Sequence, residues 1–188
     1  MRVEYNSPVI LTYAIISCGV MAASDIVPGV RYLFSAPAHI HLTGVFFYFR
    51  LFSHIAGHAD WQHLLSNFSF ILLIGPVAEE KYGSRSLLFM ILVTALAIGL
   101  LNAIFFSTGL VGASGIVFML IVLLSFTNAS EGRIPLTFVL VAVIFFGKEL
   151  VMSLRPDGIS QFAHIIGGLT GAAFGYFVKP KYILQDIN

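Results

Sequence analysis

Apolar stretches near the length of a membrane-spanning helix recur along this chain, and they limit its possible folds more than any other feature. A helix needs roughly 20 mostly apolar residues to cross the hydrocarbon core of a bilayer. Only 10% of the 188 residues are charged and 58% are hydrophobic, whereas about 25% of the residues in an ordinary soluble domain are charged. The pattern predicts an all-α membrane protein folded as a polytopic helix bundle.

Six transmembrane helices are expected, within a single domain covering residues 1–188. Their approximate ranges are 8–23, 58–78, 86–106, 113–127, 134–154 and 160–178. The first range is favoured as a retained helix over a cleaved signal peptide, because a single early positive charge precedes it and further spans follow it. Residues 25–50 hold prolines, glycines and a run of aromatics. They are expected to form an ordered, partly interfacial loop.

Charge indicates an orientation and excludes one class of partner. With six spans, six Lys and Arg residues lie on the side of the termini and four on the other side, which favours cytoplasmic termini. A net charge of +1 provides no basic patch for nucleic acid. The single cysteine, Cys18, allows no internal disulfide. The expected partners are therefore the lipid bilayer and membrane proteins, and the sequence does not indicate an oligomeric state.

The turn Gly112-Ala113-Ser114-Gly115 opens the fourth apolar stretch. A serine hydroxyl becomes a useful nucleophile when a base takes its proton. A helix that begins here would direct free N–H groups and the positive end of its dipole toward developing negative charge. A contact between helices through small residues is the alternative, and on these four residues alone it is the more common explanation.

His164 strengthens the catalytic interpretation, because it is the only histidine in the last four expected spans. An ionisable group at membrane depth is costly and marks a functional site by default. Gly167, Gly171 and Gly175 follow it at four-residue spacing, which lets a neighbouring helix approach closely. A histidine bonded to a backbone group or a lipid headgroup is the alternative. The four aspartates, Asp25, Asp60, Asp157 and Asp186, are expected in loops or the tail, so a Ser-His dyad is expected rather than a triad.

Depth links these residues to the second stretch. Ser114, His164 and His63 lie 14, 15 and 16 residues before the first residues beyond the inner ends of their spans, which are Asn128, Lys179 and Glu79. At about 1.5 Å per residue, all three are roughly 21–24 Å above the inner boundary. We therefore expect the three side chains to lie at nearly the same level.

The second stretch adds His54, His58, His63 and Asn67. His63 and Asn67 are four residues apart and share a helix face, and an asparagine amide is a good oxyanion donor. His58, expected one turn higher, could hold water or substrate. A metal site at His54-x-x-x-His58 is an alternative, but the remaining nearby histidines lie in the long loop and no His-Glu-x-x-His motif is present. No metal or other cofactor is expected.

Together these residues resemble the rhomboid family of intramembrane serine proteases, over about residues 50–175. The resemblance includes the following residues and motifs: Phe49-Arg50, His54, His58, His63, Asn67, Gly75-x-x-x-Glu79-x-x-x-Gly83, Gly112-x-Ser114-Gly115 and Ala163-His164-x-x-Gly167-x-x-x-Gly171. The chain looks like the minimal six-helix bacterial form of the family. This implies a rhomboid-like fold in the bacterial cytoplasmic membrane.

The resemblance implies a serine endopeptidase that cleaves transmembrane segments of single-pass or polytopic membrane proteins. Ser114 would be the nucleophile and His164 the general base. His63, Asn67 and the Ser114 N–H would stabilise the oxyanion, with His58 and Gly112 in support. One departure concerns the histidine, because Phe118 stands where many members have a stacking tyrosine.

Two other functions fit some of the same residues. One is a catalytically silent rhomboid-like protein that binds transmembrane helices, and the other is a histidine-rich membrane metalloenzyme. The silent protein would be expected to lack the serine or the histidine, and this chain has both. The sequence indicates neither the substrate nor the role of Lys148 and Glu149.

Overall fold

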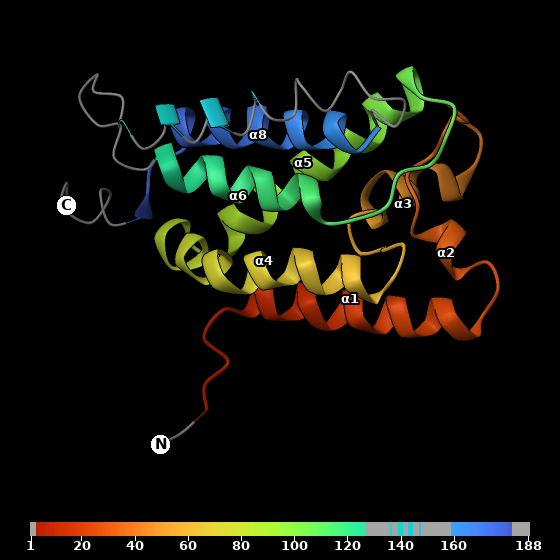
Figure 1. Cartoon of the computed structure of the whole chain (residues 1–188), viewed down its shortest axis with the longest axis horizontal. Coiled ribbons are helices and arrows are strands. Elements are labelled where there is room, and N and C mark those ends of the chain that lie inside the picture. The colour runs from red at the N-terminus through yellow and green to blue at the C-terminus, as the bar shows by residue number, and fades with distance from the viewer. Residues whose placement is uncertain are drawn as a thin grey trace.

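The computed structural model describes residues 3–126 and 159–181, with a few isolated positions between them. These residues form seven helices and no strands, as Figure 1 shows. The expected span at 134–154, which includes Lys148 and Glu149, lies outside the described segments. An all-helical bundle agrees with the fold class predicted from the apolar stretches.

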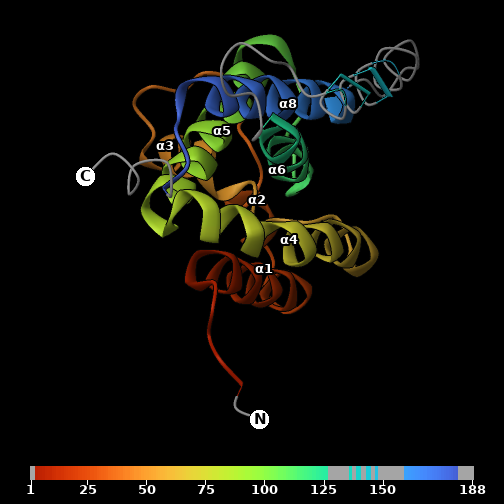
Figure 2. The same ribbon diagram turned by 90° about the vertical axis from the view of Figure 1, so that its left-hand side faces the viewer.

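Four helices lie roughly side by side along the length of the molecule. They are α1 (Pro8–Ile26), α4 (Trp61–Tyr82), α6 (Ser114–Phe126) and α8 (Ile159–Phe177), stacked in this order in Figures 1 and 2. A fifth long helix, α5 (Ser84–Phe105), packs against all four of them. Within the described residues, α6 makes its most extensive contact with α8.

The segment expected to be a loop between the first two spans contains two short helices, α2 (Val30–Leu33) and α3 (Val45–Ser53). Expecting only a loop over the aromatic run was therefore wrong. Phe47 and Leu51 are four residues apart and both are buried, and the backbone of Leu51 lies against Gly99 of α5. Packing on α5 buries one face of the run, and this burial stabilises the helix.

A glutamate of α4 caps the start of α1. Glu79 is buried, and its two carboxylate oxygens accept hydrogen bonds from the backbone N–H groups of Val9 and Ile10, at 3.0 and 3.1 Å. The first N–H groups of a helix lack partners within the helix, and a negative charge near them is favourable. Gly75, one turn earlier on α4, lets Ile10 approach closely. The Gly75-Glu79 spacing thus joins α1 to α4.

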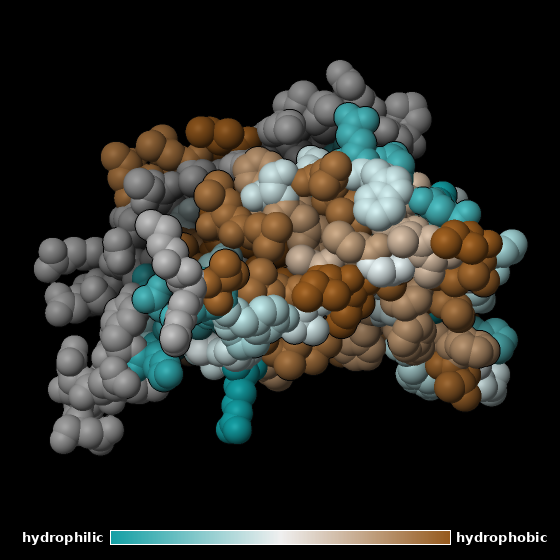
Figure 3. All heavy atoms as spheres, turned by 90° about the horizontal axis from the view of Figure 1, so that it is seen from below, coloured by the Kyte–Doolittle hydropathy of each residue, from teal (hydrophilic) through white to brown (hydrophobic). Residues whose placement is uncertain are grey.

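Much of the outer surface is apolar. Of the described helices, α1 and α5 are long and apolar enough to cross a membrane. The described part of α6 is also apolar over Ser114–Ser125, but it is shorter. Figure 3 shows one face of the molecule, and hydrophobic residues cover most of its middle. A surface of this kind fits a lipid environment better than water.

Candidate functional site

The closest approach between α6 and α8 is made through glycines. A side chain at Gly167 would clash with the backbone of Gly115, and one at Gly171 would clash with the backbone of Met119. A step of four residues along α8, from Gly167 to Gly171, matches a step of four along α6, from Gly115 to Met119. The two helices therefore run parallel, with their backbones in contact. The glycine spacing on α8 therefore lets α6 approach, as the sequence indicated.

This approach brings the start of α6 opposite His164. Ser114 is the first residue of α6, and the next residue, Gly115, faces the backbone carbonyl of Ala163. Phe118, one turn after Ser114, stacks on the imidazole of His164, with ring centroids 4.2 Å apart and planes 6° apart. Ser114 and His164 thus lie in one layer on facing helices.

The His164 ring is held by stacking rather than by a bond to the serine. No hydrogen bond between Ser114 and His164 is present among residues 3–126 and 159–181. In enzymes without substrate, catalytic hydrogen bonds are often long and tighten only when substrate binds. The arrangement therefore remains compatible with proton transfer from the serine to the imidazole.

His63 and Asn67 of α4 both lie against Gly112, two residues before Ser114. A methyl group placed on Gly112 would be 2.8 Å from Cε1 of His63 and 3.7 Å from Nδ2 of Asn67. Gly112 has a φ of 127°, which side-chain-bearing residues rarely adopt. The expectation that His63 and Asn67 share a helix face is confirmed, and that face borders the turn before Ser114.

Two sets of N–H donors near Ser114 have no hydrogen-bond partner among the residues that the structure describes. Asn67 is 7% exposed, and its Nδ2 makes no hydrogen bond with any described residue. The same holds for the backbone N–H groups of Ser114 and Gly115, which belong to the first turn of α6. A buried polar donor without a partner costs free energy, and it marks a place where a ligand oxygen could accept.

The backbone before Ser114 is held by the loop that precedes α4. The N–H of Gly112 donates to the carbonyl of His54 at 3.1 Å, and the N–H of Ala113 donates to Nε2 of His58 at 3.4 Å. A nitrogen that accepts carries no proton, so Nδ1 of His58 bears the ring proton and donates to the carbonyl of Ala56 at 3.3 Å. His58 thus positions the serine turn.

The positions of His54 and His58 differ from the helical arrangement expected for them. α4 begins only at Trp61, where Asp60 caps it by accepting from the N–H of His63 at 2.7 Å. The ring of His54 hydrogen-bonds the carbonyl of Ala95 at 3.0 Å, so it points away from His58. No group of metal-binding side chains is found in the described part of the chain.

Two residues that sequence reasoning did not place at the site hold the nearby loops together. Arg50 donates to the carbonyls of Ser35 and Ala36. Asn102 of α5 donates to the carbonyls of Pro37 and Thr108, at 3.1 and 3.0 Å. Asn102 is fully buried in a largely apolar helix. A polar amide within an apolar stretch was the signal that could have identified it.

Residues 45–181 match the Rhomboid domain family. The chain belongs to the rhomboid family. Two rhomboid-like proteins of Arabidopsis thaliana are similar to it. RHOMBOID-like protein 2 is 31% identical over 145 residues, which cover 71% of this chain and 44% of that protein. RHOMBOID-like protein 1 is 28% identical over 139 residues, which cover 71% of this chain and 36% of that protein.

The chain spans less than half the length of these two relatives in the alignments. As a member of the rhomboid family it is an integral membrane protein with a rhomboid-like helical bundle. The family acts on membrane proteins within the bilayer. The candidate active site of this rhomboid protein is therefore the region around Ser114 and His164, between α4, α6 and α8.

Proposed function

We propose that this rhomboid protein is an intramembrane serine endopeptidase with a Ser114-His164 dyad. The observation that carries the proposal is the meeting of α6 and α8 at Gly115 and Gly167, which brings Ser114 and the stacked His164 ring into one layer. Nucleophilic catalysis by serine needs a base within reach of the hydroxyl. His164 lies on α8, the helix that makes the most extensive contact with α6 among the described residues.

The proposed reaction has two steps. Oγ of Ser114 attacks the carbonyl carbon of a substrate peptide bond while a ring nitrogen of His164 accepts the hydroxyl proton. The proton then passes to the leaving amine as the C–N bond breaks, which leaves an acyl-enzyme. Water, deprotonated by His164, attacks the ester carbonyl and returns Ser114 to its hydroxyl form.

To stabilise the negative charge that develops on the substrate's carbonyl oxygen, the site needs hydrogen-bond donors that already point toward that oxygen. Nδ2 of Asn67 and the N–H of Ser114 are the proposed donors, since neither has a partner among the described residues. His63 lies beside Asn67 against Gly112 and is proposed as a third donor. Donors fixed in a water-poor site stabilise the transition state strongly.

The test is cleavage of a tagged transmembrane substrate by the purified chain in liposomes. S114A and H164A should each remove cleavage, whereas S125A should not. Ser125 is the matched control, because it lies on the same helix and its hydroxyl donates to the carbonyl of Ile121. Cleavage that survives both S114A and H164A would rule out the dyad.

Covalent labelling separates a protease from a silent helix-binding protein. A fluorophosphonate probe should label the chain, and S114A should abolish the labelling. A chain that captures transmembrane helices yet neither cleaves them nor reacts with the probe would be the silent protein instead. Both retained residues, Ser114 and His164, favour the protease.

The same proposal extends to topology and location. We infer one domain over residues 1–188 with six spans, both termini in the cytoplasm, and a bacterial cytoplasmic membrane as its location. The excess of Lys and Arg on the terminal side supports the orientation. In Figure 1, the start of α1 and the end of α8 lie at the same end of the bundle. Alkaline phosphatase fused after residue 181 should be inactive if that end is cytoplasmic.

A further inference from the structure

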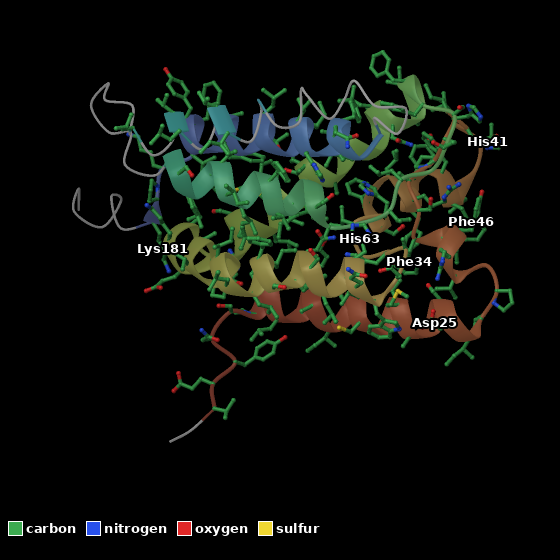
Figure 4. All side chains as sticks on the ribbon, viewed as in Figure 1. Asp25, Phe34, His41, Phe46, His63 and Lys181 are labelled. Carbon is green, nitrogen blue, oxygen red and sulfur yellow. The ribbon has the colours of Figure 1, made fainter. Side chains whose placement is uncertain are left out.

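A cavity of about 470 Å³ lies at the end of the bundle that holds α2 and α3. It is separate from the layer of Ser114 and His164. Its walls combine nitrogen donors with rings, from His39, His41, Arg50, Tyr32 and Phe47. Figure 4 shows His41 and Phe46 at this end of the molecule, far from Lys181 at the other end.

No acidic side chain lines this cavity. The sequence between Asp25 and Asp60 holds two arginines and four histidines but neither aspartate nor glutamate. Asp25 itself is turned elsewhere, because it pairs with Arg31 at 3.8 Å and accepts from Nε1 of Trp61 at 2.9 Å. The positive charge of Arg50 therefore has no counter-ion among the described residues.

Arg50 is fixed in place and still has donors to offer. Its Nε donates to the carbonyl of Ser35 at 2.8 Å and Nη2 donates to that of Ala36 at 3.2 Å. Its Cζ lies 3.9 Å from the centre of the Tyr32 ring. A guanidinium has five N–H groups, so three are used by no hydrogen bond among the residues described. A guanidinium held in this way is suited to an oxyanion such as phosphate.

The mouth of the cavity lies at the level where headgroups are expected. Phe46 is 61% exposed and Tyr48 is 50% exposed, and exposed aromatics of this kind concentrate at the membrane interface. His39 and His41 are exposed as well. His41 folds back over Gly44, where a methyl group would lie 2.7 Å from its Nδ1, so this imidazole borders the cavity.

We propose that this cavity binds a phosphate group, with Arg50, His39 and His41 as donors. The group is the phosphodiester of an anionic phospholipid or a soluble phosphate, since both present the same oxygens. Hydrogen bonds from charged nitrogen donors to phosphate are short and strong. The volume accommodates a headgroup, and the rings around the mouth suit the first part of the acyl chains.

The test is a calorimetric titration of the detergent-solubilised full chain with dihexanoyl phosphatidylglycerol, dihexanoyl phosphatidylcholine or inorganic phosphate. We expect phosphatidylglycerol to bind about ten-fold more tightly than phosphatidylcholine, whose ammonium group offsets the phosphate charge. Inorganic phosphate that competes with phosphatidylglycerol identifies the site as one for soluble phosphate. A lack of such competition identifies the ligand as the lipid headgroup.

Variants assign the binding to these side chains. H39Q/H41Q should weaken binding of phosphatidylglycerol about ten-fold, and H41K should strengthen it by adding a full charge. R31Q is the matched control, because Arg31 belongs to the same segment but does not line the cavity. Since the two histidines are exposed, all variants should unfold at the temperature of the wild type. Equal binding of both lipids, together with unchanged affinity in H39Q/H41Q and H41K, would overturn the proposal.

Discussion

The ring of Phe118 lies parallel to the imidazole of His164, with 4.2 Å between their centroids and 6° between their planes. The sequence resemblance led us to expect a stacking tyrosine at this position, and the phenylalanine present makes the ring stack without a phenol oxygen. The histidine is thereby fixed from the α6 side, by a residue one turn after Ser114. Four predictions follow from this layer and its supports.

Replacing Phe118 with leucine should lower the rate of substrate cleavage by about 2- to 10-fold, because ring stacking contributes about 0.5–1.5 kcal/mol. F118Y and F118W retain a ring and should cleave at close to the wild-type rate. The measurement is kcat and KM on a transmembrane substrate, with the loss expected in kcat. A leucine variant as fast as the wild type would show that stacking does not orient His164.

Removing either of the proposed oxyanion donors, Asn67 or His63, should slow the cleavage reaction without unfolding the protein. We expect N67A and H63A each to lower kcat by about 100-fold, the usual cost of one such donor. KM should change little, because these donors act on charge that develops in the transition state. Q62A is the control, since Gln62 neighbours His63 but is exposed. Loss of activity through a higher KM alone would assign Asn67 and His63 to substrate binding instead.

The contact between α6 and α8 should not tolerate a side chain. G167A would press a methyl group against the backbone of Gly115, and overpacking of this kind costs about 1–3 kcal/mol. The variant should unfold at a lower temperature and lose cleavage, because α6 and α8, which carry the proposed dyad, are pushed apart. G19A is the control, since nothing lies within 4 Å of that position. Thermal unfolding in detergent should leave G19A at or above the wild-type midpoint.

Glu79 should matter for stability rather than for chemistry. E79A leaves the N–H groups of Val9 and Ile10 without their acceptor, at a cost of about 1–3 kcal/mol for the buried Ile10 group. E79Q keeps one oxygen and should lie between E79A and the wild type. E80Q, at the exposed neighbouring position, should unfold as the wild type does. Equal unfolding midpoints for E79A and E80Q would contradict this role.

The parts of the candidate site that the sequence could predict are pairs of residues four apart on one helix. His63 and Asn67 are four residues apart, so any helix places them on one face, and both contact Gly112. Gly167 and Gly171 follow the same rule on α8. Because residues four apart on a helix point in a similar direction, their spacing in the sequence is enough to group them.

Other contacts that hold the candidate site together join residues far apart in the sequence, so no helical spacing reveals them. His58 accepts from the N–H of Ala113, 55 residues away, and Asn102 donates to the carbonyl of Pro37, 65 residues away. Each bond joins a side chain to a backbone group, and every residue carries those backbone groups. A sequence pattern therefore cannot indicate which backbone group is the partner.

By itself the sequence determined that the chain forms apolar helices, which residues share a helix face, and that Ser114 opens a helix after a glycine turn. These properties depend on local spacing and on the cost of leaving polar backbone unpaired in lipid. Tertiary structure alone decided that Phe118 stacks on His164, that His58 holds the turn before Ser114, and that Arg50 borders a cavity whose lining includes no acidic residue. Such contacts arise when separate helices and loops pack together, and their geometry is a property of the assembled bundle.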